Sequence, residues 1–303
     1  MNTDQLRPLT ELQALESESI HIIREVAATF SSPIMLFSGG KDSVVMVHLA
    51  AKAFWPAPIP FQLLHVDTGH NFPEVLQFRD QAVDFYGASI KIAAVQDYID
   101  DGRLRERPDG TRNPLQTLPL LDAITAGRHD AVFGGGRRDE ERARAKERVF
   151  SMRDEFGQWE PRNQRPELWS LYNGRHLPGE HVRVFPLSNW TELDVWEYIE
   201  REGIPVVPLY FAAERPMVRR NGTLLMVDDD RMPLEDGEQP EPLQVRFRTL
   251  GDYPLTGAVE SSATTVAAIV EEMRASRTSE REGRVIDHDA AASMEKKKQE
   301  GYF

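Results

Sequence analysis

Residues 38–43 read Ser38-Gly39-Gly40-Lys41-Asp42-Ser43. They stand between two apolar runs, 34–37 and 44–50, which predict a short buried strand followed by a helix. Two adjacent glycines let the backbone curl so that several N–H groups converge on one point, and the helix start adds the positive end of its dipole. Lys41 and the two serine hydroxyls add a charge and further donors. The stretch therefore predicts a phosphate-binding turn between strand and helix.

Two common phosphate loops do not fit this stretch. A Walker A loop needs Ser or Thr directly after Gly-Lys, whereas Lys41 is followed by Asp42. The dinucleotide fingerprint needs the spacing G-x-G-x-x-G, which is missing here. A turn without any ligand remains the alternative. It is the weaker one, because all six residues at 38–43 suit a phosphate-binding turn and they stand between a predicted strand and a predicted helix.

Composition narrows the class of protein. The chain has 303 residues, 40% of them hydrophobic, which is enough to bury a normal core. The net charge of -13 argues against general binding of nucleic acid. No apolar run is long enough to span a membrane, and Met1–Gln5 shows no signal-peptide pattern, so we expect a cytoplasmic protein. The absence of cysteine excludes disulfides, thiolate metal sites and thiol chemistry.

Apolar runs and turn signals alternate along the first two thirds of the chain. They predict strands at 34–37, 61–66, 89–95, 130–133 and 181–186, with helices at 10–30, 43–50, 73–87, 115–126 and 191–203. Alternating strands and helices indicate an α/β fold with a doubly wound, mostly parallel sheet. Ligands of such sheets bind at the carboxyl ends of the strands. Three motif-bearing turns, at 38–43, 67–70 and 134–138, fall at such ends.

The turn at 134–138 combines three glycines with two arginines. Gly135 and Gly136 permit a ligand to approach the backbone closely, and Arg137 and Arg138 suit an anion such as phosphate or sulfate. The basic residues continue to Arg148, and the sequence spacing places Arg138, Arg142 and Lys146 on one helix face. For the basic residues after Arg138, the alternative is a solvent-exposed helix whose charged side chains form ion pairs with one another.

Asp67, with Thr68 and Gly69, closes the strand beside the phosphate-binding turn. Its carboxylate is a candidate for the ribose or for a magnesium ion, and an ordinary Asp/Gly turn is the alternative. His65 lies within the strand and reads as a packed histidine, while His70 is open to either role.

The pattern changes after residue 203. We predict a nucleotide-binding α/β domain at 1–203 and a C-terminal extension at 204–303 that lines the site or contacts a partner. Within the extension, Asn221-Gly222 predicts a hairpin over 217–227, residues 228–242 predict a loop, and 262–275 a helix.

Taken together, these motifs resemble a known family. Residues 38–43 match the PP-loop pattern S-G-G-x-D-S of the ATP pyrophosphatase superfamily, whose fold is called adenine nucleotide α-hydrolase-like. The segments 65–69, 135–142, 186–192 and 283–289 look like the small subunit of bacterial heterodimeric ATP sulfurylase. The resemblance covers essentially the whole chain. The related adenylyl-sulfate and phosphoadenylyl-sulfate reductases need a cysteine near the C-terminus, which this chain lacks.

The resemblance implies a nucleotidyltransferase that converts ATP and sulfate to adenosine 5′-phosphosulfate and pyrophosphate, the first step of sulfate assimilation. It implies that the PP-loop residues, with Asp67, Gly135 and Gly136, hold ATP, and it implies a GTPase large subunit as partner in a heterodimer. Our candidates for catalysis are Lys41, Arg137 and Arg138, and for Mg²⁺ binding with ATP they are Asp42 and Asp67.

Two other functions remain open from the sequence. One is another PP-loop enzyme that adenylates an acceptor other than sulfate. The other is a regulatory subunit that binds ATP without cleaving it, against which the intact Lys41, Asp42 and Ser43 argue.

Overall fold

A computed structural model describes residues 9–275 with gaps at 108–109, 141–145 and 160. The first part of the chain alternates strands and helices, as predicted. Its elements are α1 (Glu11–Thr29), β1 (Pro33–Leu36), α2 (Lys41–Phe54), β2 (Gln62–Asp67), α3 (Pro73–Tyr86), β3 (Ile90–Ala94), α4 (Val95–Asp100), α5 (Thr117–Gly127), β4 (Ala131–Phe133), β5 (Phe150–Arg153), β6 (His181–Val184) and α7 (Glu192–Glu202).

The six strands form one sheet in the order β3-β2-β1-β4-β6-β5. All neighbours pair in parallel except β5, an edge strand that pairs antiparallel to β6. The doubly wound, mostly parallel sheet is therefore confirmed, whereas β5 was not predicted. β1 is central, so the turns after β2, β1 and β4 lie next to one another at the carboxyl edge.

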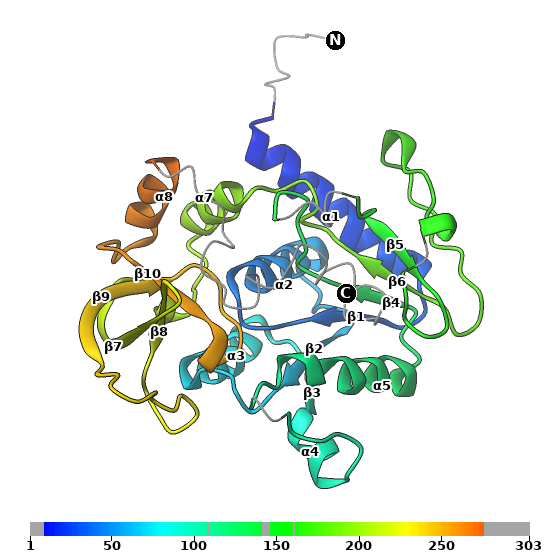
Figure 1. Ribbon diagram of the computed structural model, residues 1–303. Coiled ribbons are helices and arrows are strands. Elements are labelled where there is room, and N and C mark those ends of the chain that lie inside the picture. The colour runs from blue at the N-terminus through cyan, green and yellow to red at the C-terminus, as the bar shows by residue number, and fades with distance from the viewer. Residues whose placement is uncertain (1–8, 108–109, 141–145, 160, 276–303) are drawn as a thin grey trace.

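Helices cover both faces of the sheet (Figure 1). Met35, Leu63 and Phe133 belong to a core that includes buried residues of α1, α2 and α7. The alternate residues Ile34 and Val132 pack instead into a smaller core with α5. Strand residues point alternately to the two faces, so each strand serves both cores.

The C-terminal part builds a closed four-stranded barrel in the order β10-β8-β7-β9. Its strands are β7 (Ala213–Arg220), β8 (Thr223–Met226), β9 (Glu241–Phe247) and β10 (Gly257–Glu260), and α8 (Val266–Ala275) follows. The Asn221-Gly222 turn joins β7 to β8, which confirms the predicted hairpin. β9 and β10 were not predicted.

The barrel packs against the segment that follows β2. Phe72 contacts the rings of Phe247 and Tyr253, with centroids 5.1 and 5.5 Å apart, and the Tyr253 N–H donates to the His70 carbonyl at 2.7 Å. The barrel consequently stands beside the carboxyl edge of the sheet (Figure 1). The domain boundary at 203 stays a prediction. Arg142 of the predicted basic helix face, and the segment 283–289, lie outside the described residues.

Among the described residues, no helix combines the length and the apolar character that crossing a bilayer requires.

A buried serine ties α1 to the turn before α7. Ser19 donates to the Pro186 carbonyl at 2.8 Å and accepts from the Trp190 indole N–H at 3.0 Å. We predict that Ser19→Ala lowers the free energy of unfolding by about 1–3 kcal/mol, because both buried groups lose their partner. Ser17→Ala, on the exposed side of the same helix, should change it by less than about 0.5 kcal/mol. Urea unfolding followed by circular dichroism measures both, and equal effects would contradict the prediction.

Candidate functional site

The phosphate loop, residues 38–43, connects β1 to α2 as predicted. Gly39 has φ +78°, and a Cβ added there would lie 3.0 Å from Val75 Cγ1, so the position requires glycine. Gly40 caps the helix and offers no side chain to its first turn. Ser38 Oγ accepts from the Gly40 N–H at 3.3 Å, and Ser43 Oγ donates to the Gly40 carbonyl at 2.8 Å. These contacts shape a helix N-terminus without a side-chain cap, and helix N-termini are suitable sites for anions.

Lys41 is held by two residues from the C-terminal part of the chain. Its backbone N–H donates to the Tyr210 hydroxyl at 2.9 Å, and its Nζ donates to the Arg248 carbonyl at 3.4 Å. The Arg248 guanidinium pairs with buried Glu192 at 2.6 Å. The sequence did not predict the roles of Tyr210, Arg248 and Glu192, since no local pattern shows that the fold brings them to residues 38–43. The side chain of Lys41 is 1% exposed as a result.

The Asp42 carboxylate joins the phosphate loop to the turn after β4. Arg137 Nε donates to Asp42 Oδ1 at 2.7 Å, and Lys41 Nζ lies 3.3 Å from Asp42 Oδ2. Burial raises the pKa of Asp42, but the charges of Lys41 and Arg137 outweigh burial and hold that pKa below its usual range. A Cβ on Gly135 would come within 3.2 Å of Asp42 Cβ, so glycine permits this approach. The structure thus brings Lys41, Asp42, Gly135 and Arg137 together.

Arg138 lies in a different environment from Arg137. Its Nη1 donates to Asn189 Oδ1 at 2.6 Å, and its Nη2 is 3.9 Å from Glu167 Oε2. Its side chain is 35% exposed, whereas that of Arg137 is 1% exposed. The two arginines that the sequence analysis treated as a pair therefore contact different groups.

Asp67 ends β2 beside the phosphate loop, and its Oδ1 accepts from the Gly69 N–H at 2.7 Å. The turn that follows is fixed by residues far along the chain. Arg112 donates to the Thr68 carbonyl at 3.1 Å, and Thr68 donates to Asp252 Oδ1 at 2.7 Å. Gly69 has φ +75°, and a Cβ there would meet Arg112 Nη1 at 2.5 Å. Arg112 and Asp252 were also missed, because only the fold places them here.

His65 is buried in β2, as predicted, and shares a hydrogen bond of 2.9 Å with the Phe37 carbonyl. Burial is the largest effect on its imidazole and lowers its pKa. Burial also lowers the pKa of His70, and the charge of Arg112 adds to that effect. Both histidines are therefore biased toward the neutral form.

A metal ion would have to draw part of its ligands from the substrate. Within the described residues there is no group of three or more His, Asp or Glu side chains placed to hold one. Mg²⁺ at nucleotide sites commonly uses one or two carboxylates together with phosphate oxygens and water. Both oxygens of Asp42 face cations, whereas Asp67 uses Oδ1 within its own turn. Asp67 fits such a role better than Asp42 does.

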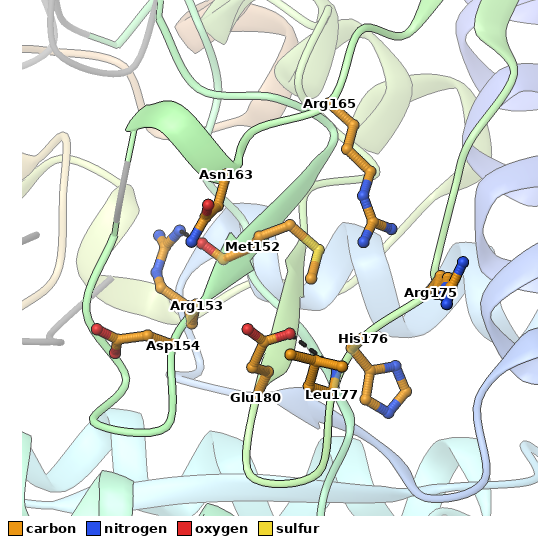
Figure 2. A pocket seen from close by; sticks show the side chains of 9 residues that line it. All are labelled: Met152, Arg153, Asp154, Asn163, Arg165, Arg175, His176, Leu177 and Glu180. Carbon is orange, nitrogen blue, oxygen red and sulfur yellow. Dashed lines mark hydrogen bonds between the residues drawn. The ribbon is translucent and has the colours of Figure 1, made fainter.

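A pocket of about 370 Å³ lies away from the phosphate loop, at the β5 edge of the sheet. Figure 2 shows Arg153, Arg165, Arg175, His176 and Glu180 among the side chains that line it. Because β5 runs antiparallel to β6, its last residue pairs with the first residue of β6. The pocket is therefore displaced toward the amino ends of the parallel strands, away from the carboxyl edge.

Comparisons with known proteins agree with the motifs. Residues 32–258 match the model of the phosphoadenosine phosphosulfate reductase domain family. The chain is 64% identical to sulfate adenylyltransferase subunit 2 of Streptomyces lavendulae, over 97% of this chain and 92% of that one. It is 59% identical to the protein of the same name from Saccharophagus degradans, over 97% and 98%.

One similar solved structure is the FMN adenylyltransferase of Candida glabrata in complex with ATP. Its TM-score is 0.50 at 15% identity, and the alignment covers 93% of this chain and 91% of that one. At this identity the likeness concerns the fold alone.

Because Arg137 and Arg138 lie in different environments, we predict that replacing each one changes the free energy of unfolding by a different amount. We expect Arg137→Met to lower the free energy of unfolding by about 3 kcal/mol, the low end for breaking a buried ion pair, because Lys41 still neutralises Asp42. Arg138→Met should cost less than about 1 kcal/mol, as for an exposed pair. Chemical denaturation measures both values. Equal costs would mean that the contact between Arg137 and Asp42 contributes no special stability.

Proposed function

The chain belongs to the family of sulfate adenylyltransferase subunit 2 proteins, and we propose how its residues perform the transfer. In this reaction a sulfate oxygen forms a bond to the α-phosphorus of ATP, the bond between that phosphorus and the bridging oxygen to the β-phosphate breaks, and pyrophosphate leaves. Sulfate is already ionised, so no general base is needed. Catalysis then consists of positioning the reactants and stabilising the charge on the leaving group.

The observation that carries this proposal is the set of charges around the phosphate loop. The N-terminus of α2, the Lys41 side chain and buried Arg137 converge at one point of the carboxyl edge. Pyrophosphate gains negative charge as it leaves, and preorganised donors stabilise that charge without reorganising. We assign the β- and γ-phosphates to this loop, with Ser38, Gly39, Gly40 and Ser43 supplying donors.

Asp42 acts in this proposal as a positioning residue. Its carboxylate holds Lys41 and Arg137 in place, and its lowered pKa keeps it ionised at neutral pH. We assign the backbone of Gly135 and Gly136 to the nucleotide, and Arg138, which is half-buried beside Asn189, is a candidate for contacting sulfate at the rim. Mg²⁺ bound with ATP would neutralise phosphate charge, and Asp67 is the carboxylate we assign to it.

The name of the relatives, subunit 2, supports action together with another subunit. We propose that this partner is a GTPase whose hydrolysis of GTP drives the transfer, because this chain has no GTPase motif of its own. We propose the cytoplasm, where both nucleotides are available, as the place of reaction.

The experiment is an assay of pyrophosphate release from ATP by this chain, with and without sulfate, and with and without the candidate GTPase and GTP. Release that requires sulfate and rises with the partner and GTP is the expected result. Release that is indifferent to sulfate would point to another acceptor, and ATP binding with no release under any condition would point to a regulatory subunit.

Removing the charge of Lys41 should lower turnover. We predict that Lys41→Met lowers sulfate-dependent turnover by about 100-fold or more, the usual effect of losing one preorganised charge-stabilising donor. Lys52→Met is the matched control, because Lys52 lies on the same helix and pairs with Glu16 and Glu202 at its far end. Its turnover should stay within about twofold of the wild type, since a partly exposed ion pair contributes little. Similar losses in both variants would remove Lys41 from the catalytic assignment.

A further inference from the structure

The face of the sheet turned toward α5 carries two buried arginines that the proposed reaction does not use. On β6, Val182 and Val184 pack into the core that contains α1, so His181 and Arg183 point to the opposite face. Arg183 pairs in register with Ser151 of β5, and Arg153 pairs with His181. Both arginines are nearly inaccessible, with 2% exposure for Arg183 and 1% for Arg153.

One of these arginines has a buried carboxylate beside it. Arg153 Nη2 lies 2.9 Å from Glu147 Oε1, and its Nη1 donates to Ser151 Oγ at 2.6 Å. Ser151 Oγ in turn donates to Glu147 Oε1 at 2.6 Å. Glu147 therefore offsets one of the two positive charges, and among the three described side chains Arg153, Arg183 and Glu147 one positive charge is left over.

Arg183 carries the second positive charge of the pair. Among the described residues, none of its three guanidinium nitrogens has a hydrogen-bond partner. A buried charge without partners is costly, and native proteins pair such groups or place them at ligands. Burial and the nearby charge of Arg153 lower the pKa of Arg183 to about 9, even though Glu147 acts in the opposite direction.

The pKa of His181 is lowered by burial and by the same positive charges. Burial is the largest effect on its imidazole, and Arg183 and Arg153 add to it, so its pKa falls to about 2. The ring is therefore neutral near pH 7. It neither supplies the missing negative charge nor adds to the positive charge of the two arginines.

The pocket at the β5 edge is lined by one of the two arginines, Arg153, and Arg183 is not among its lining residues. Arg153 belongs both to the buried cluster and to the lining of the 370 Å³ pocket (Figure 2). The cluster lies apart from the phosphate loop, because β4 stands between β6 and β1. At the usual spacing of strands, β6 is about 10 Å from β1.

We propose that Arg183 and Arg153 form a buried binding site for a small, doubly charged tetrahedral oxyanion such as sulfate or phosphate. Guanidinium groups bind such anions through paired N–H donors, and the charge of Arg183 would offset one of the two charges of the anion. The anion is either the sulfate that reacts or a free oxyanion that does not. The distinction between these two sources rests on the function proposed above, whereas the binding site does not.

The test is thermal unfolding of the full chain during titration with sodium sulfate and, separately, sodium phosphate, at ionic strength kept constant with sodium chloride. A ligand that binds only the folded state raises the Tm with its concentration. We expect the Tm of the wild type to rise by about 4 °C or more. Binding that adds about 2 kcal/mol to the free energy of unfolding would produce a rise of this size. For Arg183→Met the rise should be lost, and its Tm without oxyanion should equal or exceed that of the wild type.

Arg219→Met is the matched control, because Arg219 is 55% exposed on the barrel and pairs there with Glu260. It should respond to both anions as the wild type does, which also corrects for general stabilisation by sulfate. Arg183→Lys keeps the charge without the planar fork and should show a reduced rise, and it replaces the Met variant if that variant does not fold. Equal rises in the wild type and in the Arg183 variants would overturn the proposal.

Kinetics of the complete enzyme distinguish the two sources. If the bound anion is the reacting sulfate, Arg183→Met raises the KM for sulfate at least about tenfold and leaves the KM for ATP unchanged. If it is a free oxyanion, the KM for sulfate stays the same while the rise in Tm is lost. Absence of sulfate-dependent turnover in the wild type would contradict the proposed function and leave the comparison of Tm values intact.

Discussion

The contact of Asp42 with Lys41 and Arg137 is the interaction on which the site depends. It links the first turn of α2 to the glycine-rich turn after β4, and so it fixes two neighbouring loops of the carboxyl edge to each other. The carboxylate of Asp42 lies between two cations at the end of a helix. That arrangement suits a pyrophosphate group, because the cations are already in place before the ligand arrives.

The C-terminal part of the chain completes this site from outside the parallel sheet. Tyr210 and Arg248 hold Lys41, while Asp252 fixes the turn that follows Asp67. Both loops of the candidate site therefore contact residues beyond 203.

The sequence predicted the parts of the fold that are specified locally. The turn at 38–43 between strand and helix, the hairpin at Asn221-Gly222 and the helix that begins after Thr10 depend on residues a few positions apart, and the structure confirms these elements. The Thr10 side chain forms the predicted capping box with Gln13.

Strands β5, β9 and β10 could not be predicted in the same way. β5 is four residues long and carries Ser151 and Arg153 on one face, so it lacks an apolar signal, and its partner β6 lies some thirty residues away in the sequence. Tyr210, 169 residues from Lys41, contacts the phosphate loop only because the chain returns to it. The grouping of Arg137 with Arg138 reflected adjacency in sequence, whereas the fold directs the two side chains to different partners.

In the proposed function, the phosphate loop holds pyrophosphate as a leaving group while the adenylyl group moves to sulfate. The most direct measurement follows the label from ATP labelled at the α- or at the γ-phosphate, with sulfate, the partner subunit and GTP present. We expect the α-label to appear in adenosine 5′-phosphosulfate and the γ-label in pyrophosphate. Release of the γ-label as orthophosphate, with the α-label retained in ADP, would contradict it.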